Sequence, residues 1–304
     1  AELYSLCRKI DDLADDALTE TEKAVARQKL SSLEHALAQG ALPEESLSET
    51  KLSGEELREI YRQAQQLFSS QPLALGALRD MITTVQQDLQ PVRIGDNRQL
   101  LQYAYGVAGT VGVMMTCVLE VPDKTRALPH AIDLGIGMQL TNIARDVLED
   151  AYLGRIYLPA DGKAGALKPE ALIAGDPESR HDAWNGLCEL IEQAESYYAS
   201  GWQGLVYLPL RARLAIAVAA FVYREIGRQI LRRGEERYWQ SRSVVGPGRK
   251  FVVSVTALSR LGTEPWRHPD IGHDDRLHNG LNTCLNAEET RSTNGGNDAS
   301  QTGA

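Results

Sequence analysis

The sequence has little that marks nucleic-acid-binding, redox or disulfide-stabilised proteins. Its 304 residues carry a net charge of -9, and this acidic excess argues against nucleic acid as a partner. Its four cysteines include no CxxC pair and no Cys/His ligand spacing: Cys7, Cys117, Cys188 and Cys284. We therefore expect free, mostly buried thiols in a reducing compartment.

Long uncharged apolar runs are also missing. A bilayer-spanning helix needs about 18–20 such residues, and we find no comparable segment, so any membrane association is expected to be peripheral. The chain opens on Ala1, already inside an amphipathic pattern, without a helix N-cap or a signal peptide. We therefore expect that the true N-terminus is missing.

Alternating strand patterns are nearly absent, and helical periodicity takes their place. The sequence therefore predicts an all-α fold with one domain over residues 1–260. The predicted helices span residues 1–17, 20–39, 54–69, 72–88, 98–119, 126–152, 179–200, 209–233 and 247–260. Ile156 to Leu158 is predicted to be a short extended piece. Residues 261–304 have hardly any periodic apolar positions and are predicted to form a low-complexity tail, disordered from about residue 275.

The first motif that carries chemistry lies in the first predicted helix. Tyr4, Arg8, Asp11 and Asp15 recur every three or four residues beside an apolar stripe, so they share one face. Two carboxylates one turn apart repel each other by about 0.2–0.5 kcal/mol. A bridging divalent cation such as Mg²⁺ would offset this repulsion. A solvated acidic helix end, with Arg8 only an intrahelical partner of Asp11, explains the motif equally well.

The second motif lies in a segment that is apolar on nearly every side, which is typical of a buried helix. Within this segment, Gln139, Asn142, Asp146 and Asp150 form a narrow polar ribbon, again spaced by three or four residues. Unpaired buried carboxylates cost several kcal/mol each. A polar network paired by Arg145 or Arg155 would satisfy them, but two facing acidic rows are also how helical bundles build metal sites. We favour the metal site.

Several stretches of the chain resemble the squalene/phytoene synthase family. They are Leu3–Asp15, Tyr103–Gly112, Gln139–Asp146 and Gly154–Pro159, and the similarity, closest to the bacterial phytoene synthases, extends over roughly residues 1–255. The resemblance implies an all-α isoprenoid-synthase fold with a central cavity. It also implies head-to-head condensation of two geranylgeranyl diphosphates, through a cyclopropylcarbinyl (prephytoene) diphosphate, to phytoene in carotenoid biosynthesis.

The resemblance assigns expected roles to particular residues. The expected metal ligands are Asp11, Asp15, Asn142, Asp146 and Asp150. The expected catalytic residues are Asp11, Asp15, Asp146 and Asp150, with Tyr105 lining the reaction centre. The expected substrate-binding residues are Tyr4, Arg8, Gln139, Asn142, Arg145, Tyr223 and Arg242. The implied cofactor is Mg²⁺, with Mn²⁺ as a substitute, and no NADPH is expected. The implied location is cytoplasmic, with membrane contact because substrate and product are lipids.

The chain also departs from the family pattern. Most of the helix that precedes the first motif, which supplies a Ser-Phe phosphate-binding segment in the family, is absent. Ile94 stands where a flap tyrosine is expected, and Ala104 stands between Tyr103 and Tyr105 in place of cysteine. From spacing alone, Gly109 and Gly112 favour ordinary tight helix packing, and Tyr105 fits a core tyrosine equally well.

Three alternatives remain open at this point. A synthase that uses farnesyl diphosphate would make presqualene diphosphate, squalene or diapophytoene. A non-catalytic family relative would act in assembly or binding, although both acidic rows are intact. A diiron-type bundle needs Glu-x-x-His motifs on two helices, and the sequence has a single match, Glu178 to His181, beside Pro177. Chain length of the substrate and oligomeric state are not readable from the sequence.

Overall fold

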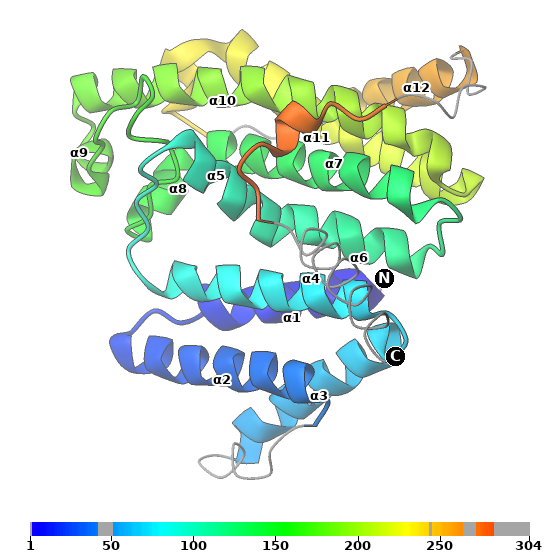
Figure 1. Cartoon of the computed structure of the whole chain (residues 1–304). Helices are drawn as coiled ribbons and strands as arrows, with labels where there is room; N and C mark the ends of the chain where they lie inside the picture. Colours follow the sequence, from blue (N-terminus) through cyan, green and yellow to red (C-terminus); the bar gives the residue numbers. More distant parts are fainter. Residues whose placement is uncertain (1, 42–50, 243–244, 264–271, 283–304) are drawn as a thin grey trace, which may run out of the picture.

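The chain folds into stacked layers of helices. The computed structural model describes residues 2–41, 51–242, 245–263 and 272–282, which contain helices and no strands, so the predicted all-α class is confirmed. The α-helices are α1 (Glu2–Asp15), α2 (Glu20–Gln39), α3 (Lys51–Phe68), α4 (Pro72–Val85), α5 (Asn97–Ala104), α6 (Thr110–Val118), α7 (Lys124–Arg145), α8 (Val147–Tyr152), α9 (Pro169–Ala174), α10 (Pro177–Gly204), α11 (Leu210–Tyr238) and α12 (Pro247–Thr263). Figure 1 shows α2 and α3 at one end, then α1 and α4, then α5 to α7, and α10 to α12 at the other end.

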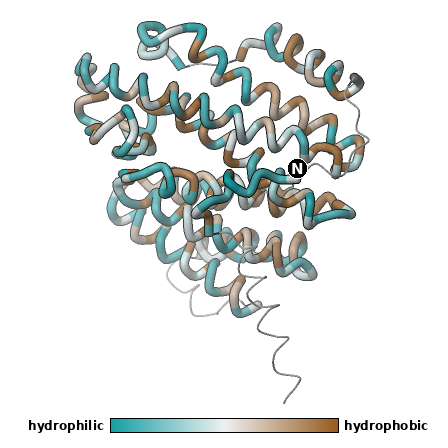
Figure 2. The backbone as a smooth tube through the Cα atoms, turned by 45° about the horizontal axis from the view of Figure 1, so that its top comes forward, coloured by the Kyte–Doolittle hydropathy of each residue, from teal (hydrophilic) through white to brown (hydrophobic). Residues whose placement is uncertain are grey.

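Local sequence signals set many of these boundaries. Thr19 caps α2 in a capping box with Glu22, and Gly40 ends that helix in the left-handed region at φ 74°, where glycine avoids the steric penalty of a Cβ. Hydrophobic and hydrophilic positions alternate along most helices (Figure 2), and buried apolar residues from α1, α2, α4, α7 and α10 belong to one core. Burial of these apolar faces holds the layers together.

The long predicted helix over residues 98–119 is interrupted. A π-helical turn, Tyr105–Gly109, separates α5 from α6. A Cβ on Gly112 would lie 2.2 Å from the Ala131 carbonyl oxygen, and one on Gly135 would lie 2.2 Å from that of Ala108. Gly112 therefore lets α6 and α7 pack closely, as its spacing suggested, and Gly135 does the same from α7. By length and composition, Asn97–Val118 is the one stretch among the described helices that could cross a membrane, but 61% of it is buried inside the fold.

The helix predicted over residues 126–152 is not continuous in the structure. The chain leaves helical geometry at Asp146, with φ -109° and ψ 18°, so that α7 ends at Arg145 and α8 begins at Val147. Asp146 therefore lies at the junction between α7 and α8, and helical periodicity alone does not set the direction of its side chain.

A second bend lies in α11. Gly234 adopts φ 76° and ψ 168°, a conformation that only glycine takes readily. After the bend the chain turns back onto the α7–α8 junction, where the Tyr238 hydroxyl donates to the Ala144 carbonyl at 2.9 Å. The predicted end of this helix at residue 233 coincides with the bend.

The C-terminal part contains an ordered segment that the sequence prediction missed. Residues 272–282, here called the C-terminal strap, contain a short 3₁₀ helix, η5 (Asp275–His278), and bury Leu281. Tyr197 on α10 donates to the Leu277 carbonyl at 3.0 Å. The expectation of disorder from residue 275 is therefore wrong for residues 275–282, while residues 283–304 lie outside the described part.

Two smaller predictions concern extended backbone and cysteines. Ile156 forms an isolated parallel bridge with Arg93, which confirms the short extended piece. Cys7, Cys117 and Cys188 are free thiols, of which Cys117 is buried and the other two are partly buried. Cys284 lies outside the described residues.

Candidate active site

A large cavity runs between the layers. It has a volume of about 750 Å³ and is lined by α1, α4, α6, α7, α10 and α11. One end of the cavity carries charged side chains of both signs: Arg8, Asp11, Asp15, Asp88, Arg145, Asp146, Asp150 and Arg155. The rest of the wall is largely apolar, with residues that include Val107, Val111, Met115, Leu134, Met138, Leu205, Leu208 and Ile216. The cavity therefore offers a charged end and a long apolar end to one elongated ligand.

The first acidic row stands on α1 at the charged end. Arg8 contacts Asp11 at 3.3 Å and Asp12 at 2.8 Å, so it is an intrahelical partner of this row. The side chains of Asp11 and Asp15 remain 42% and 39% exposed. Tyr4, 75% exposed, lies at the mouth of the same cavity. The row is therefore open to solvent and to any ligand that enters.

The second acidic row faces the first across the cavity and is less exposed. The Asp146 carboxylate accepts from Arg145 Nε at 2.8 Å and from Arg242 Nε and Nη2 at 2.8 Å each. Its side chain is 17% exposed. Arg145 does pair with the row, as the alternative network required, and Arg242 reaches it from beyond the Gly234 bend.

The rest of the second row lacks such partners. Asn142 donates to Gln139 Oε1 at 3.4 Å, but its own Oδ1 is buried and accepts no hydrogen bond from the described residues. Among those residues, nothing pairs with the carboxylate of Asp150 either. Tyr223 lines the same cavity from α11. Unsatisfied buried oxygens are uncommon in folded proteins, so Asn142 Oδ1 is available as a ligand for a cation.

Burial and mutual repulsion perturb the carboxyl groups. Burial, reinforced by the charge of Asp146, raises the pKa of Asp150 to about 8, while Arg155 opposes the rise. Burial, followed by the charge of Asp15, raises the pKa of Asp11 to about 6. Both groups would therefore ionise more readily with a divalent cation between them. The oxygens of Asp11, Asp15, Asn142, Asp146 and Asp150 make up the hard donor set that Mg²⁺ prefers.

Four residues that link the two rows were not assigned from the sequence. The carboxylate of Asp88 accepts from the hydroxyls of Tyr157 at 2.7 Å and Tyr103 at 2.9 Å. Arg155 donates to Asp15 Oδ1 at 3.0 Å and to the Asp88 carbonyl at 3.0 Å. Asp88 lies in η2 (Gln86–Leu89), just past α4. The sequence had offered Arg155 only as a possible partner of the second row and Tyr157 only as part of the Gly154–Pro159 stretch, and nothing in the local pattern singled out Asp88.

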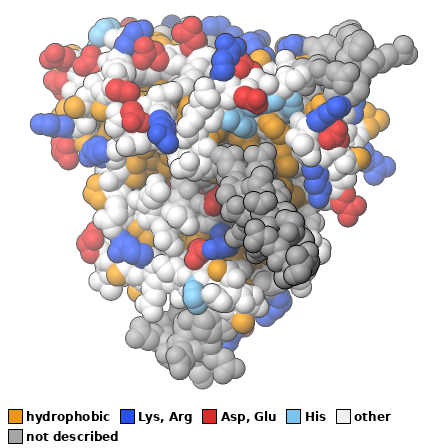
Figure 3. All heavy atoms as spheres, in the orientation of Figure 1, with side chains coloured by type: hydrophobic (Ala, Val, Ile, Leu, Met, Phe, Trp, Pro, Cys, Tyr) orange, Lys and Arg blue, Asp and Glu red, His pale blue; other side chains and the backbone are white. Residues whose placement is uncertain are grey.

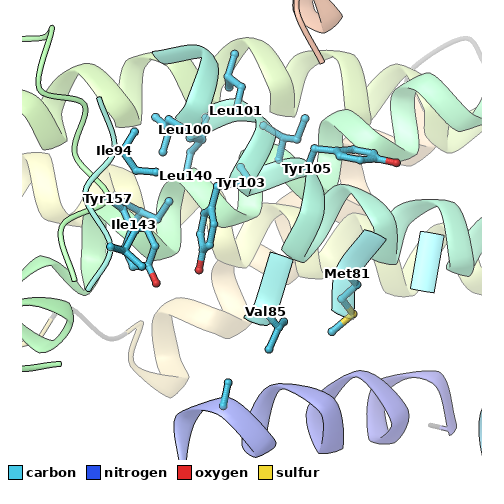
Figure 4. Close-up of a cluster of buried hydrophobic side chains, with 14 of the residues drawn as sticks. Met81, Val85, Ile94, Leu100, Leu101, Tyr103, Tyr105, Leu140, Ile143 and Tyr157 are labelled. Atoms are coloured by element: carbon cyan, nitrogen blue, oxygen red, sulfur yellow. The ribbon is translucent and has the colours of Figure 1, made fainter. Parts of the chain in front are cut away.

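Tyr105 is not where the resemblance put it. Its ring is 1% exposed, its hydroxyl donates to Asp80 Oδ2 at 3.0 Å, and it does not line the cavity, whereas Tyr103 does. In Figure 4 the hydroxyl of Tyr105 points away from those of Tyr103 and Tyr157. Tyr103 shares a helical face with Val107 and Val111, and a residue two positions later lies on the opposite side. The expectation for Tyr105 is therefore wrong in its placement.

The diiron alternative finds no support in the described residues. Glu178 and His181 are both exposed in the first turns of α10, and His181 Nδ1 lies 3.1 Å from Glu235 on α11. Diiron sites in helical bundles point their Glu-x-x-His motifs into the core. These two side chains therefore belong to the surface.

An all-α fold around one cavity with facing acidic rows defines an isoprenoid-synthase type of enzyme. The squalene/phytoene synthase family matches residues 1–249. The chain is 33% identical to the 15-cis-phytoene synthase of Pantoea ananas, over 88% of this chain and 84% of that one. It is 35% identical to the 15-cis-phytoene synthase of Enterobacter agglomerans, over 86% and 85%. A crystal structure of a dehydrosqualene synthase with a ligand superimposes with a TM-score of 0.63 at 25% identity, covering 86% of each chain. The chain belongs to the squalene/phytoene synthase family.

Proposed function

We propose that this chain joins two geranylgeranyl diphosphates head to head, through prephytoene diphosphate, to give phytoene with release of diphosphate. The observation that carries this proposal is the cavity of about 750 Å³ with a charged end and an apolar end. A prenyl diphosphate has the same division, with an anionic head and a hydrocarbon tail. The names of the bacterial relatives support phytoene as the product and carotenoid biosynthesis as the context.

We assign Mg²⁺ binding to Asp11, Asp15, Asn142, Asp146 and Asp150, with Mn²⁺ as a substitute. The unpaired buried Oδ1 of Asn142 and the raised pKa of Asp150 both fit this group. When bound, Mg²⁺ would neutralise the departing diphosphate and so lower the barrier to ionisation of the allylic carbon.

Arginine and tyrosine side chains at the charged end hold the diphosphate groups of the substrates. Arg8 and Tyr4 stand at the open side, where they can receive a diphosphate from solvent. Arg145 lies deeper, with its side chain 18% exposed, and fixes the orientation of Asp146. Arg242, which follows α11 in the chain, binds the same Asp146 carboxylate and so closes the charged end of the cavity.

The apolar end protects the cationic intermediates. Prenyl transfer of this kind passes through carbocations that water would trap, so the wall must exclude water along the chain of the substrate. Val107 and Val111 on one side and Leu134 and Met138 on the other supply that wall. The Tyr103 and Tyr157 rings stack at 4.6 Å between centroids, and their hydroxyls keep Asp88 in place beneath the charged end.

Product analysis with each prenyl diphosphate tests the proposal. The purified chain is incubated with geranylgeranyl or farnesyl diphosphate, with and without Mg²⁺, beside an Asp146→Asn variant as the matched control. We expect phytoene from geranylgeranyl diphosphate only, with Mg²⁺ only, and at least a hundredfold less from the variant. Consumption of farnesyl diphosphate alone would overturn the phytoene assignment. Equal product from the variant would overturn the assigned role of the second acidic row.

A further inference from the structure

A second cluster of metal-type side chains lies outside the proposed active site. Asp133 on α7 is completely buried. Its Oδ1 is 2.8 Å from His278 Nε2, and its Oδ2 is 2.8 Å from His273 Nε2. Both histidines belong to the C-terminal strap. The three donor atoms all lie within 4.8 Å of one another. In Figure 3, histidine side chains appear on the face where the strap crosses α10 in Figure 1.

The hydrogen bonds of His273 restrict its protonation state. Its Nδ1 is 3.1 Å from Asp275 Oδ1, while its Nε2 faces Asp133. A neutral imidazole has a single N–H and can donate to only one of two carboxylates. His273 must therefore be protonated or direct its Nε2 lone pair at a cation. A carboxylate on the second ring nitrogen is the arrangement that metal-ligating histidines show, because it fixes the tautomer and raises the basicity of the ligand.

The spacing and rigidity of the three ligands also suit a metal. His273 and His278 are separated by four residues, within the range of three to five that zinc sites use, and η5 fixes the turn between them. The third ligand stands on α7, a long buried helix. Tetrahedral Zn²⁺ needs donors about 3.3 Å apart. The two 2.8 Å contacts, which are to different oxygens of Asp133, would open by about 0.5 Å on binding, and donor pairs that now lie as much as 4.8 Å apart would close to the same spacing. Two side chains on a surface segment can make both adjustments.

We infer that Asp133, His273 and His278 form a transition-metal site of the zinc class that fastens the C-terminal strap to α7. Two imidazoles and one carboxylate select a borderline metal such as Zn²⁺ over Mg²⁺. The side chain of His278 is 19% exposed, so water can take the fourth position. The metal adds to the contacts that the strap already makes, which include Arg98 to the Gly280 carbonyl at 3.2 Å.

The site is separate from the acidic rows but connected to the cavity. Asp133 lies within α7, and Asp146 lies at its C-terminal end, 13 residues further on. This separation is about 20 Å along a helix. Ser200 donates to Asp133 Oδ2 and also contacts His130 Nδ1, at 2.9 Å. His130 lines the apolar part of the cavity. A metal at Asp133 therefore orders the wall against which the substrate tail would lie.

Zinc titration of the 304-residue chain tests this inference. The protein is treated with a chelator and then titrated calorimetrically with Zn²⁺ in saturating Mg²⁺, which occupies the acidic rows. The binding is repeated for the His273→Ala/His278→Ala double variant. A matched His181→Ala control removes an exposed histidine from another surface. Cobalt is used as a spectroscopic probe, since tetrahedral Co²⁺ with nitrogen ligands absorbs visible light strongly.

We expect one equivalent of Zn²⁺ in the wild-type chain and in the control, and at least hundredfold weaker binding in the double variant. A hundredfold excess of Zn²⁺ over its Kd should raise the melting temperature of the wild type by about 5 °C or more, and leave that of the double variant unchanged. Circular dichroism of the double variant verifies that the helical core is folded. Absence of stoichiometric binding, or equal binding by the double variant, would overturn the inference, because the ion would then lie elsewhere or nowhere.

Discussion

The two acidic rows have the same helical spacing but differ in what surrounds them. On α1, Asp11 and Asp15 are 42% and 39% exposed; Asp11 pairs with Arg8 of the same helix at 3.3 Å, and Asp15 pairs with Arg155 at 3.0 Å. At the α7–α8 junction, Asp146 is 17% exposed and is held by Arg242, which lies 96 residues further along the chain. Equal spacing therefore gives one row that is partly exposed and one that is more deeply buried, although each receives an arginine from a distant segment of the chain.

This difference sets the charge state of each row. Burial and like charges raise the pKa of Asp150 to about 8 but that of Asp11 only to about 6. The carboxyl group of Asp11 therefore ionises at lower pH than that of Asp150. The first row is thus suited to attract a cation from solvent, and the second gains most from binding it.

The largest expected effects come from removing one carboxylate of each row. Asp11→Asn and Asp150→Asn should both lower kcat by about 10²- to 10³-fold, because each deletes a charged ligand at the diphosphate end. Their effects on stability should differ. Without metal, a raised folded-state pKa contributes stability that is complete below the unfolded value of about 3.9 and is lost as pH rises through the folded value.

Chemical unfolding in chelator between pH 7 and 9 separates the two variants. The wild type and Asp11→Asn should lose unfolding free energy over this range, because Asp150 ionises near pH 8. Asp150→Asn should lose much less, since its amide does not titrate. The same pH dependence in all three proteins would mean that the second row is no more desolvated than the first.

A second variant disconnects the two rows. Arg155 holds Asp15 and the Asp88 carbonyl and also lowers the pKa of Asp150. Arg155→Gln should reduce kcat/KM by about 10- to 100-fold, the usual effect of losing a group that orients metal ligands. Arg93→Gln is the matched control, because Arg93 donates to the Val92 and Gly154 carbonyls in the same region and to neither row. If both variants lost activity equally, the loss would come from a disturbed backbone around the Arg93–Ile156 bridge and not from the broken link between the rows.

The smallest expected effect is the pH dependence of magnesium binding. Asp150 must lose its proton to bind a cation, so affinity should rise with pH by about tenfold per unit below pH 8. Calorimetry in two buffers with different ionisation enthalpies should detect about one proton released near pH 7. In Asp150→Asn the slope should nearly vanish above about pH 7, where Asp11 with its pKa of about 6 is mostly ionised. A slope that survived in this variant would assign the proton to another group.

Local periodicity was sufficient to predict most of the fold. The apolar and polar positions of α1, α2 and α10 repeat at the helical period, which depends only on neighbouring residues. The same logic identified both acidic rows, since residues three and four apart share a face wherever the helix packs. It failed at Asp146, where the helix breaks, because a break of one residue leaves the pattern on either side intact.

The sequence by itself thus determined the all-α class, the two rows and, through resemblance, the family. Only the tertiary structure decided which side chains meet those rows. Asp88, Arg155 and Arg242 reach the charged end from distant segments, Tyr103 takes the place expected of Tyr105, and the strap histidines meet Asp133. The physical reason is that helical periodicity is a property of adjacent residues, whereas these contacts depend on how chain reversals, such as the bend at Gly234, bring remote segments together in space.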